Sequence, residues 1–514
     1  MTLDVVGSGR FGAARSGDRF ASIGSVAAGR FRYILFAVLL GAYYWALLTS
    51  GNRHLFPAVP LGMVFNSMAE HLVHGSFEVS PSAIGFEGFV RDGRTYAYWG
   101  VFCAALRMPL LLIPGGIATD VTAVSSLTAI MVGVWFKLRC LALVATVVPD
   151  GRDKRFLIAI CTAAVLLSGA QTAFMRLSIY QEVCFWAGAL ASGFVYGALR
   201  CLLEDCYPAG RLTWMAILAG LAFNTRVTTG IGLYAALGLL MARLLLIPGP
   251  ASGGSFARRL ARLAAPVVVL AAFAVGAGVV NYGRWGNPLV FVDFRYYGIY
   301  AEAAHADNPV RLHAYGAFNI QRIPFGLLYY FLPIWILPRG DQAYFFQDWQ
   351  NRLIEVTELP PSSFLLTDML FIILLCCLIR HLISARGRSI VPLGNTTLIL
   401  AGLAAPALLM LCAIAMCYRY RIEFYPFLDL GGFLGLYTVL AHRQSGPMSR
   451  RLRSGLIAAM VIGIAGSHAA CAVYKISPLG SALRTMPDGV VEGYKSLAMS
   501  RAGATGGGGV APGR

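Results

Sequence analysis

Residues 121–155 decide the fold of this chain, and they read VTAVSSLTAIMVGVWFKLRCLALVATVVPDGRDKR. The run from 121 to 148 is mostly apolar, and a helix needs roughly 20 such residues to cross the hydrocarbon core of a bilayer. It is followed at 151–155 by GRDKR, and loops rich in Lys and Arg stay on the cytoplasmic side of a membrane. The stretch therefore predicts a membrane-spanning helix whose C-terminal end faces the cytoplasm.

Similar runs recur along nearly the whole chain. Of its 514 residues, 57% are apolar and only 13% are charged, whereas globular proteins carry about 25% charged residues. Apolar stretches of bilayer-spanning length follow one another and leave no room for a large soluble domain. The sequence therefore predicts an all-α polytopic membrane protein.

The net charge of +18 could suggest binding to nucleic acid. However, the basic residues are nearly all arginines, and they lie in short clusters between the apolar runs. That distribution is typical of membrane topology, so we expect no nucleic-acid partner. The cysteines lie mostly within apolar runs and show no metal-binding spacing, which is typical of small core residues.

The arginine clusters also predict the topology. Five arginines precede the first span, and the segment 1–30 is expected to be disordered and cytoplasmic. The alternation predicts about eleven spans, an outer-face tail at 476–514, and a location in a bacterial inner (plasma) membrane. The spans are expected near 33–50, 121–148, 156–175, 183–203, 212–225, 228–247, 264–282, 364–380, 392–417, 422–441 and 455–474.

Two long segments are expected on the outer face, at 51–118 and 283–363. The first contains the apolar run 97–114, which holds Arg107 and two prolines. If this run crossed the membrane, GRDKR would face outward, so we interpret it as a juxtamembrane or re-entrant element. The second contains IPFGLLYYFLPIWILP at 323–338, which is too short and too rich in proline to span and favours an interfacial helix.

Charged groups at a membrane surface are candidates for function because their burial is costly. Asn66, Glu70 and His74 recur at helical spacing in the first outer loop. Glu70 could act as a general base or bind a divalent cation with His71 and His74. A surface helix with one polar face would explain the same spacing, and no metal site is assigned.

The next segment of that loop, from Glu87 to Gly100, reads EGFVRDGRTYAYWG. Glu87 and Asp92 are candidate catalytic acids, although Asp92 precedes a glycine and could merely shape a turn. The aromatic residues that follow are candidate substrate-binding residues, because such rings stack on sugars and also anchor at membrane interfaces. They are Tyr96, Tyr98 and Trp99.

Four arginines lie at the predicted outer ends of spans. Arginine is suited to bidentate contact with phosphate, so these four are candidate lipid-phosphate-binding residues. Each could instead pair with a nearby carboxylate such as Glu182 or Glu423, or reach the interface. The four are Arg176, Arg226, Arg419 and Arg421.

A turn at Gly286–Pro288 is followed by Arg295 and Tyr296. These two side chains have the chemistry of a carbohydrate or phosphate surface, and we include them among the candidate substrate-binding residues. Local packing would explain them equally well.

The order of these segments resembles the GT-C class of membrane glycosyltransferases, especially a large bacterial branch grouped with family 39-type transferases. The resemblance covers roughly residues 33–440, and it implies a GT-C-like transmembrane domain at 31–475 with outer-face juxtamembrane helices. The residues that carry it are His74-Gly75, Glu87, Asp92–Gly100, Pro109, Tyr282–Pro288 and Tyr418–Phe427.

The resemblance implies transfer of a sugar from a polyprenyl-phosphate donor to a glycan or lipid acceptor at the outer face. A carboxylate in the first outer loop would take the proton of the acceptor hydroxyl, and arginines would stabilise the departing lipid phosphate. Relatives that transfer aminoarabinose or mannose carry an acid at the start of the first outer helix, but residues 51–69 contain none. The base would then be Glu70, Glu87 or Asp92, or catalysis has been lost or altered.

A non-enzymatic role is the alternative, as a flippase-type transporter of lipid-linked glycans or a partner in envelope assembly. A transporter places charged residues within its spans along a passage. Most charges of this sequence lie at span ends, which favours the transferase.

Overall fold

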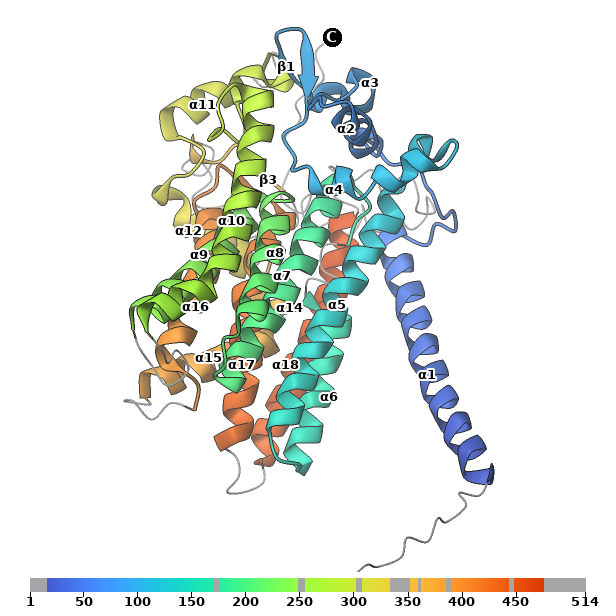
Figure 1. Ribbon diagram of the computed structural model, residues 1–514, viewed down its shortest axis with the longest axis vertical. Coiled ribbons are helices and arrows are strands. Elements are labelled where there is room, and N and C mark those ends of the chain that lie inside the picture. Colours follow the sequence, from blue (N-terminus) through green and yellow to red (C-terminus); the bar gives the residue numbers. More distant parts are fainter. Residues whose placement is uncertain are drawn as a thin grey trace, which may run out of the picture.

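The computed structural model describes residues 16–169, 175–247, 255–301, 307–332, 352–358, 362–384, 390–442 and 448–475. Within these ranges the chain is mostly helical, and four short strands form two two-stranded sheets. Long helices run side by side as a bundle, and short helices and a β-hairpin lie at one end of it (Figure 1). We call this end, which carries the short helices and the hairpin, the loop end.

Six helices of the described chain are long and apolar enough to cross a membrane. This supports the prediction of a multi-pass helical membrane protein, but not the count of about eleven. They are α5 (Thr122–Val147), α7 (Ile179–Glu204), α9 (Val227–Leu246), α10 (Phe256–Trp285), α16 (Leu393–Leu411) and α18 (Arg450–Lys475).

Other predicted spans form shorter helices. The helices α6 (Arg152–Leu167) and α15 (Met369–Ser384) have 16 residues, and α8 (Ala209–Phe223) has 15. At 1.5 Å per residue these are about 24 Å long, less than the roughly 30 Å of a hydrocarbon core. The helix α17 (Tyr425–His442) has 18 residues and carries Asp429.

The first helix, α1, covers Ser16–Thr49. It therefore includes residues 16–30, which the sequence analysis places in a disordered segment; residues 1–15 and the tail at 476–514 lie outside the described chain. Near the loop end α1 packs on the bundle, where Tyr44 and Leu48 are buried. Tyr33 to Leu39 are largely exposed, as expected for a surface that faces lipid.

The first outer loop folds into short elements at the loop end. They are α2 (Val64–Val73), α3 (Pro81–Ile84), η1 (Gly85–Glu87), the hairpin of β1 (Phe89–Arg91) and β2 (Arg94–Tyr96), α4 (Phe102–Ala105), η2 (Met108–Leu112) and η3 (Gly116–Ala118). Residues 97–114 thus contain no continuous helix of spanning length. Pro109 at the start of η2 is one cause, because proline disrupts a continuing helix.

The second large outer segment is also built from short pieces. They are η6 (Phe294–Tyr296), η7 (Gly298–Ala301), α11 (Asp307–Tyr315), η9 (Ile320–Arg322), α12 (Ile323–Phe331), and β3 (Val356–Thr357) paired in parallel with β4 (Ala415–Met416). The helices α14 (Phe364–Thr367) and η11 (Tyr418–Glu423) follow. Of the predicted interfacial segment 323–338, α12 covers the first part, and residues 333–338 lie outside the described chain.

Small residues allow the long helices to approach closely. A Cβ at Gly402 of α16 would lie 2.2 Å from the backbone nitrogen of Ala236 in α9, and one at Gly232 would lie 2.3 Å from Pro406. Such close backbone approach is a common means of helix association in membranes, where apolar side chains gain little by leaving lipid. The bundle thus positions the helix ends from which the candidate site is built.

Candidate functional site

Glu87 is the one predicted catalytic acid that the structure places in a buried polar site. It ends η1 and is 9% exposed. Tyr180, at the start of α7, donates a hydrogen bond to its Oε1 at 2.5 Å, and Tyr297 donates to its Oε2 at 2.7 Å. Three segments far apart in sequence therefore fix this carboxylate.

The phenol of Tyr297 remains a donor across the ordinary pH range. Burial raises its pKa, and the negative charge of Glu87 raises it further. Burial also raises the pKa of Tyr98, which lies nearby in the first outer loop, and Glu87 adds to that increase. A carboxylate has about four lone-pair sites, so these two bonds leave Glu87 able to accept a proton from another group.

Two of the predicted phosphate-binding arginines are linked to this carboxylate through aromatic rings, because Tyr180 contacts both Glu87 and Arg419, and Tyr420 lies between Arg419 and Arg226. The Arg419 guanidinium lies 4.9 Å from the ring centre of Tyr180 and 5.4 Å from that of Tyr420. The Arg226 guanidinium lies 4.9 Å from the same Tyr420 ring. We call Glu87, Tyr180, Tyr297, Arg226, Arg419 and Tyr420 the Glu87 cluster.

Each of these two arginines also pairs with a buried carboxylate. Arg226 binds Glu423, which accepts further hydrogen bonds from Thr228 and Thr229. Arg419 binds Glu358. The side chain of Arg226 is still 18% exposed and that of Arg419 is 20% exposed, so each retains an accessible edge that can contact an anion.

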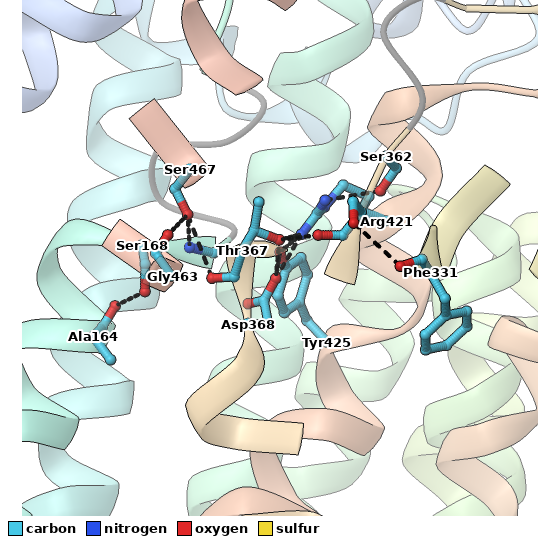
Figure 2. Close-up of polar contacts among 12 residues, drawn as sticks. Ala164, Ser168, Phe331, Ser362, Thr367, Asp368, Arg421, Tyr425, Gly463 and Ser467 are labelled. Atoms are coloured by element: carbon cyan, nitrogen blue, oxygen red, sulfur yellow. Dashed lines mark hydrogen bonds and ion pairs between the residues drawn. The ribbon is translucent and has the colours of Figure 1, made fainter. Parts of the chain in front are cut away.

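Arg421 does not belong to this cluster, although the sequence analysis names it as a phosphate ligand. Its side chain is fully buried and donates to Asp368 at 2.6 Å, Thr367 at 2.5 Å and Ser362 at 2.8 Å. Figure 2 shows these groups and Tyr425 converging on the guanidinium. The donors of Arg421 are satisfied inside the bundle, and the side chain links η11 to α14. The structure thus shows Arg421 paired with a carboxylate, which is the alternative to phosphate binding given above.

Arg176 is buried in a different environment. Its guanidinium lies 4.9 Å from the ring centre of Tyr474. Tyr474 also stacks on Tyr418 and lies 3.4 Å from a carboxylate oxygen of Glu358. Arg176 therefore lies close to the Glu87 cluster but is not part of it.

The other two candidate acids lie on the surface. The carboxylate of Glu70 has no polar partner in the described chain and is exposed, because the buried part of α2 ends at Ala69. Asp92 is exposed, pairs with the adjacent Arg91, and adopts a positive φ in the β1–β2 turn. Its role as a turn residue is thus the interpretation that holds, and neither acid reaches the two arginines.

The predicted substrate-binding residues divide in the same way. Trp99 and Tyr96 are buried, and they pack against Phe65 and Trp285, respectively. Tyr98 is partly exposed and packs against Trp99.

Arg295 and Tyr296 lie in η6, directly before Tyr297 of the Glu87 cluster. Arg295 is exposed and binds Asp293, whose pKa is lowered by that hydrogen bond, and its guanidinium lies 5.7 Å from the Tyr296 ring centre. Of the predicted substrate-binding residues, Tyr98 lies beside the Glu87 cluster.

A second buried ion pair joins the first outer loop to the bundle. Arg107 donates two hydrogen bonds of 2.8 Å to Glu182 of α7 and a third to Asn66 at 3.0 Å. Ser125 of α5 donates to the same carboxylate at 2.5 Å. Both oxygens of Glu182 are engaged by these neighbours, so this pair positions the loop over the helix ends.

No group of three or more His, Cys, Asp or Glu side chains that could hold a metal occurs in the described part of the chain. His71 and His74 form hydrogen bonds with the backbone of α2. The geometry therefore assigns no site to the divalent cation considered for Glu70.

Several members of the site were missed from sequence. Tyr180, Tyr297 and Glu358 contact Glu87 or Arg419 across separations of 61 to 239 residues in the chain. The only sequence signal was that Tyr180 and Glu358 lie close to predicted outer ends of spans.

Comparisons with known proteins give a weak likeness in fold. The apo oligosaccharyltransferase of Archaeoglobus fulgidus has a TM-score of 0.43 and 14% identity, over 85% of this chain and 55% of that one. AglB of the same organism, in complex with an inhibitory peptide and a dolichol-phosphate, has a TM-score of 0.42 and 13% identity, over 86% and 56%. This chain thus spans about half the length of those proteins. No family model and no curated protein matches it, and the likeness assigns neither a family nor a reaction.

Proposed function

We propose that this protein is a GT-C-like glycosyltransferase that moves a sugar from a polyprenyl-phosphate donor to an envelope acceptor at the outer face of a bacterial inner membrane. The observation that carries the proposal is the Glu87 cluster. It holds one buried carboxylate beside two partly exposed arginines, with Tyr180 in contact with both Glu87 and Arg419. A base and an anion-binding group are the two parts that such a transfer needs.

The proposed step gives each group one role. The acceptor hydroxyl attacks the anomeric carbon of the sugar and passes its proton to Glu87. The bond from that carbon to the phosphate oxygen breaks, and the polyprenyl phosphate leaves with the bonding electrons. Arg419 and Arg226 stabilise the added negative charge through their exposed edges, while Tyr180 and Tyr297 hold Glu87 in position.

The proposal is tested by analysis of envelope lipids and polysaccharides from a deletion strain. The strain is complemented with wild type, Glu87→Gln, or the surface variants Glu70→Gln and Asp92→Asn. Glu87→Gln should lower product formation by about 10²–10⁴-fold, the usual contribution of a general base, and the two surface variants should restore it fully. If Glu87→Gln restores product formation at wild-type protein levels, the proposal is wrong.

One observation favours a second candidate, a flippase for lipid-linked glycans. Lys137 lies within α5 and forms a 2.9 Å ion pair with Asp429 in α17. Both line a small cavity of about 30 Å³ with Ser192, and charged residues inside spans mark transport pathways in many membrane proteins. If the protein is a flippase, a Lys137→Met/Asp429→Leu double variant should abolish transbilayer movement of a lipid-linked sugar in proteoliposomes. If the protein is a glycosyltransferase, the same variant should leave sugar transfer intact.

A further inference from the structure

The two arginines of the Glu87 cluster are each matched by an acid that lies outside it. Glu358 binds Arg419 and Glu423 binds Arg226, and both acids are buried. Together with Glu87, three buried carboxylates thus share two arginines. Of these three acids, Glu87 is the one that has no arginine partner in the described part of the chain.

Glu358 is fixed in the position that faces Arg419. Its Oε2 accepts a hydrogen bond from the backbone nitrogen of Tyr418 at 2.8 Å and lies 3.4 Å from the hydroxyl of Tyr474. Arg419 binds the other oxygen, Oε1. The backbone is held as well, since the nitrogen of Glu358 donates to the Met416 carbonyl at 2.9 Å. These contacts keep the carboxylate beside one guanidinium.

Glu423 is held in a similar way. Thr228 and Thr229, at the start of α9, donate to its two oxygens at 2.5 and 2.7 Å, and Arg226 binds it from the residue before that helix. Glu423 ends η11, the same short helix that carries Arg419. One short helix therefore supplies the arginine of the first ion pair and the acid of the second.

This division of charge matters for a carboxylate that must accept a proton. An opposite charge within about 4–6 Å favours the ionised form of an acid and weakens it as a base by roughly 1–3 pH units. Arg419 contacts the ring of Tyr180, whose hydroxyl donates to Glu87, so one side chain separates the two charges. An ion pair offsets the charge of Arg419, whereas the two phenols that hold Glu87 are neutral.

The other groups around Glu87 add no further acid or unmatched cation. In the described chain, the titratable and charged groups that face it or contact its partners are Tyr98, Tyr180, Tyr297, Tyr300, Tyr420, Arg226 and Arg419. Five of these are tyrosines, and both arginines are paired. The proton affinity of Glu87 therefore depends on the two ion pairs.

We propose that Glu358 and Glu423 are positioning residues that hold Arg419 and Arg226 and offset their charges, and thereby leave Glu87 able to act as the base. A guanidinium has five N–H donors, and each arginine is partly exposed, so N–H groups remain for the departing phosphate. The inference rests on the proposed function, because it takes Glu87 as the base. The charge pairing can nevertheless be measured without sugar transfer.

The test is a pH titration of Glu87 in full-length protein in nanodiscs, followed by the carboxyl C=O band in infrared difference spectra. The band is assigned by its loss in Glu87→Gln. Glu358→Gln leaves Arg419 unmatched and should move the midpoint about one unit to lower pH, and Arg419→Gln should move it about one unit to higher pH. The double variant Glu358→Gln/Arg419→Gln removes both charges and should titrate close to the wild type.

Glu204→Gln is the matched control. Glu204 also binds two arginines, but it lies at the other end of α7 from Tyr180, roughly 36 Å away at 1.5 Å per residue. It should leave the midpoint unchanged. If Glu358→Gln does not fold, Glu423→Gln carries the same expectation, and Arg419→Gln and the double variant should still differ by about one unit.

The outcomes separate this inference from the proposed function. In the transfer assay, the acid limb of kcat/KM against pH should follow the infrared midpoints, since it reports the base of the free enzyme. If transfer depends on Glu87 but the midpoint is the same in all variants, the ion pairs are only structural and the inference is wrong. If the midpoints shift as expected but the wild type transfers no sugar, the pairing is supported and the proposed function is wrong.

Discussion

Three buried carboxylates near the loop end join segments that are far apart in the chain. Glu182 joins η2 and α5 to α7, Glu423 joins η11 to α9, and Glu87 joins η1 to α7 and to the segment after η6. Such residues act as fixed points for loops that have little apolar surface of their own. Because a buried charge left without its partner is destabilising, their loss should affect stability as well as chemistry.

Glu182→Gln should destabilise the protein by about 3–5 kcal/mol, the usual cost of leaving a buried partner uncompensated. Arg107 would then keep its charge with no carboxylate in reach. The measurement is the thermal unfolding of purified protein in detergent. Asp150→Asn is the control, since its carboxylate is exposed and pairs with Lys154 at the surface; it should change stability by less than about 1 kcal/mol. Equal effects of the two changes would contradict the role of Glu182.

Tyr297→Phe and Tyr180→Phe should each lower kcat of sugar transfer by about tenfold or more and leave KM for the lipid donor nearly unchanged. Each removes a hydrogen bond to a charged carboxylate, worth roughly 1.5–3 kcal/mol, and keeps the aromatic ring, so the ring at position 180 still faces Arg419. Tyr282→Phe, at an exposed position, serves as the comparison. A rise in KM with unchanged kcat would show that the tyrosines bind the donor and do not position Glu87.

The sequence supports part of this site. Glu87 is predictable because it is an acid in an outer loop, and Arg226 and Arg419 because they lie at the ends of apolar runs. Nothing in the sequence separates Glu87 from Glu70 and Asp92, because burial depends on contacts with Tyr180 and Tyr297, which lie 93 and 210 residues away. The pairing of Arg421 with Asp368 is not visible in the sequence for a similar reason, since Asp368 precedes it by 53 residues.

At the scale of elements, the contact of α9 with α16 shows how two long helices pack. Gly232 and Gly402 bring the backbones together, each against the other helix. The apolar periodicity of either helix gives no hint of this, because both are apolar on nearly every side. The sequence thus predicts that the two helices exist but not which faces meet.

Gly402→Val should destabilise the protein by at least about 1–3 kcal/mol, as expected when extra carbons are forced into a packed interface. The new Cβ would lie 2.2 Å from a backbone nitrogen of α9, which cannot move out of the way by rotation of a side chain. Gly238→Val in α9 is the matched control, since a Cβ there has no neighbour within 4 Å. Urea or thermal unfolding of both variants in detergent distinguishes them, and similar losses would refute the packing account.

At the scale of the whole molecule, apolar length predicts a multi-pass helical protein, but it predicts more long helices than occur in the described part of the chain. Runs such as 212–225 and 364–380 are apolar enough, yet α8 and α15 have only 15 and 16 residues. The run 97–114 is divided into α4 and η2 by its arginine and proline. The distribution of arginines predicts how the chain is oriented across the membrane, and this orientation can be tested.

The predicted topology places the turn between α7 and α8 in the cytoplasm and the β1–β2 hairpin outside. Cys206 in that turn is exposed, so a membrane-impermeant maleimide should label it only after spheroplasts are permeabilised. In a Cys206→Ser background, Asp92→Cys should be labelled without permeabilisation. Labelling of Cys206 in intact spheroplasts would reverse the orientation and place the Glu87 cluster on the cytoplasmic side.

The uneven packing of α1 has a consequence for how the chain tolerates change. Its half near the loop end holds Tyr44, which donates a hydrogen bond to the Leu166 carbonyl, and Tyr43, which bonds His468. The residues just before this part, Tyr33 to Leu39, are exposed. A saturation mutagenesis scan should therefore divide this one helix in two: any lipid-compatible residue would survive in the first part, while almost none would replace the tyrosines in the second.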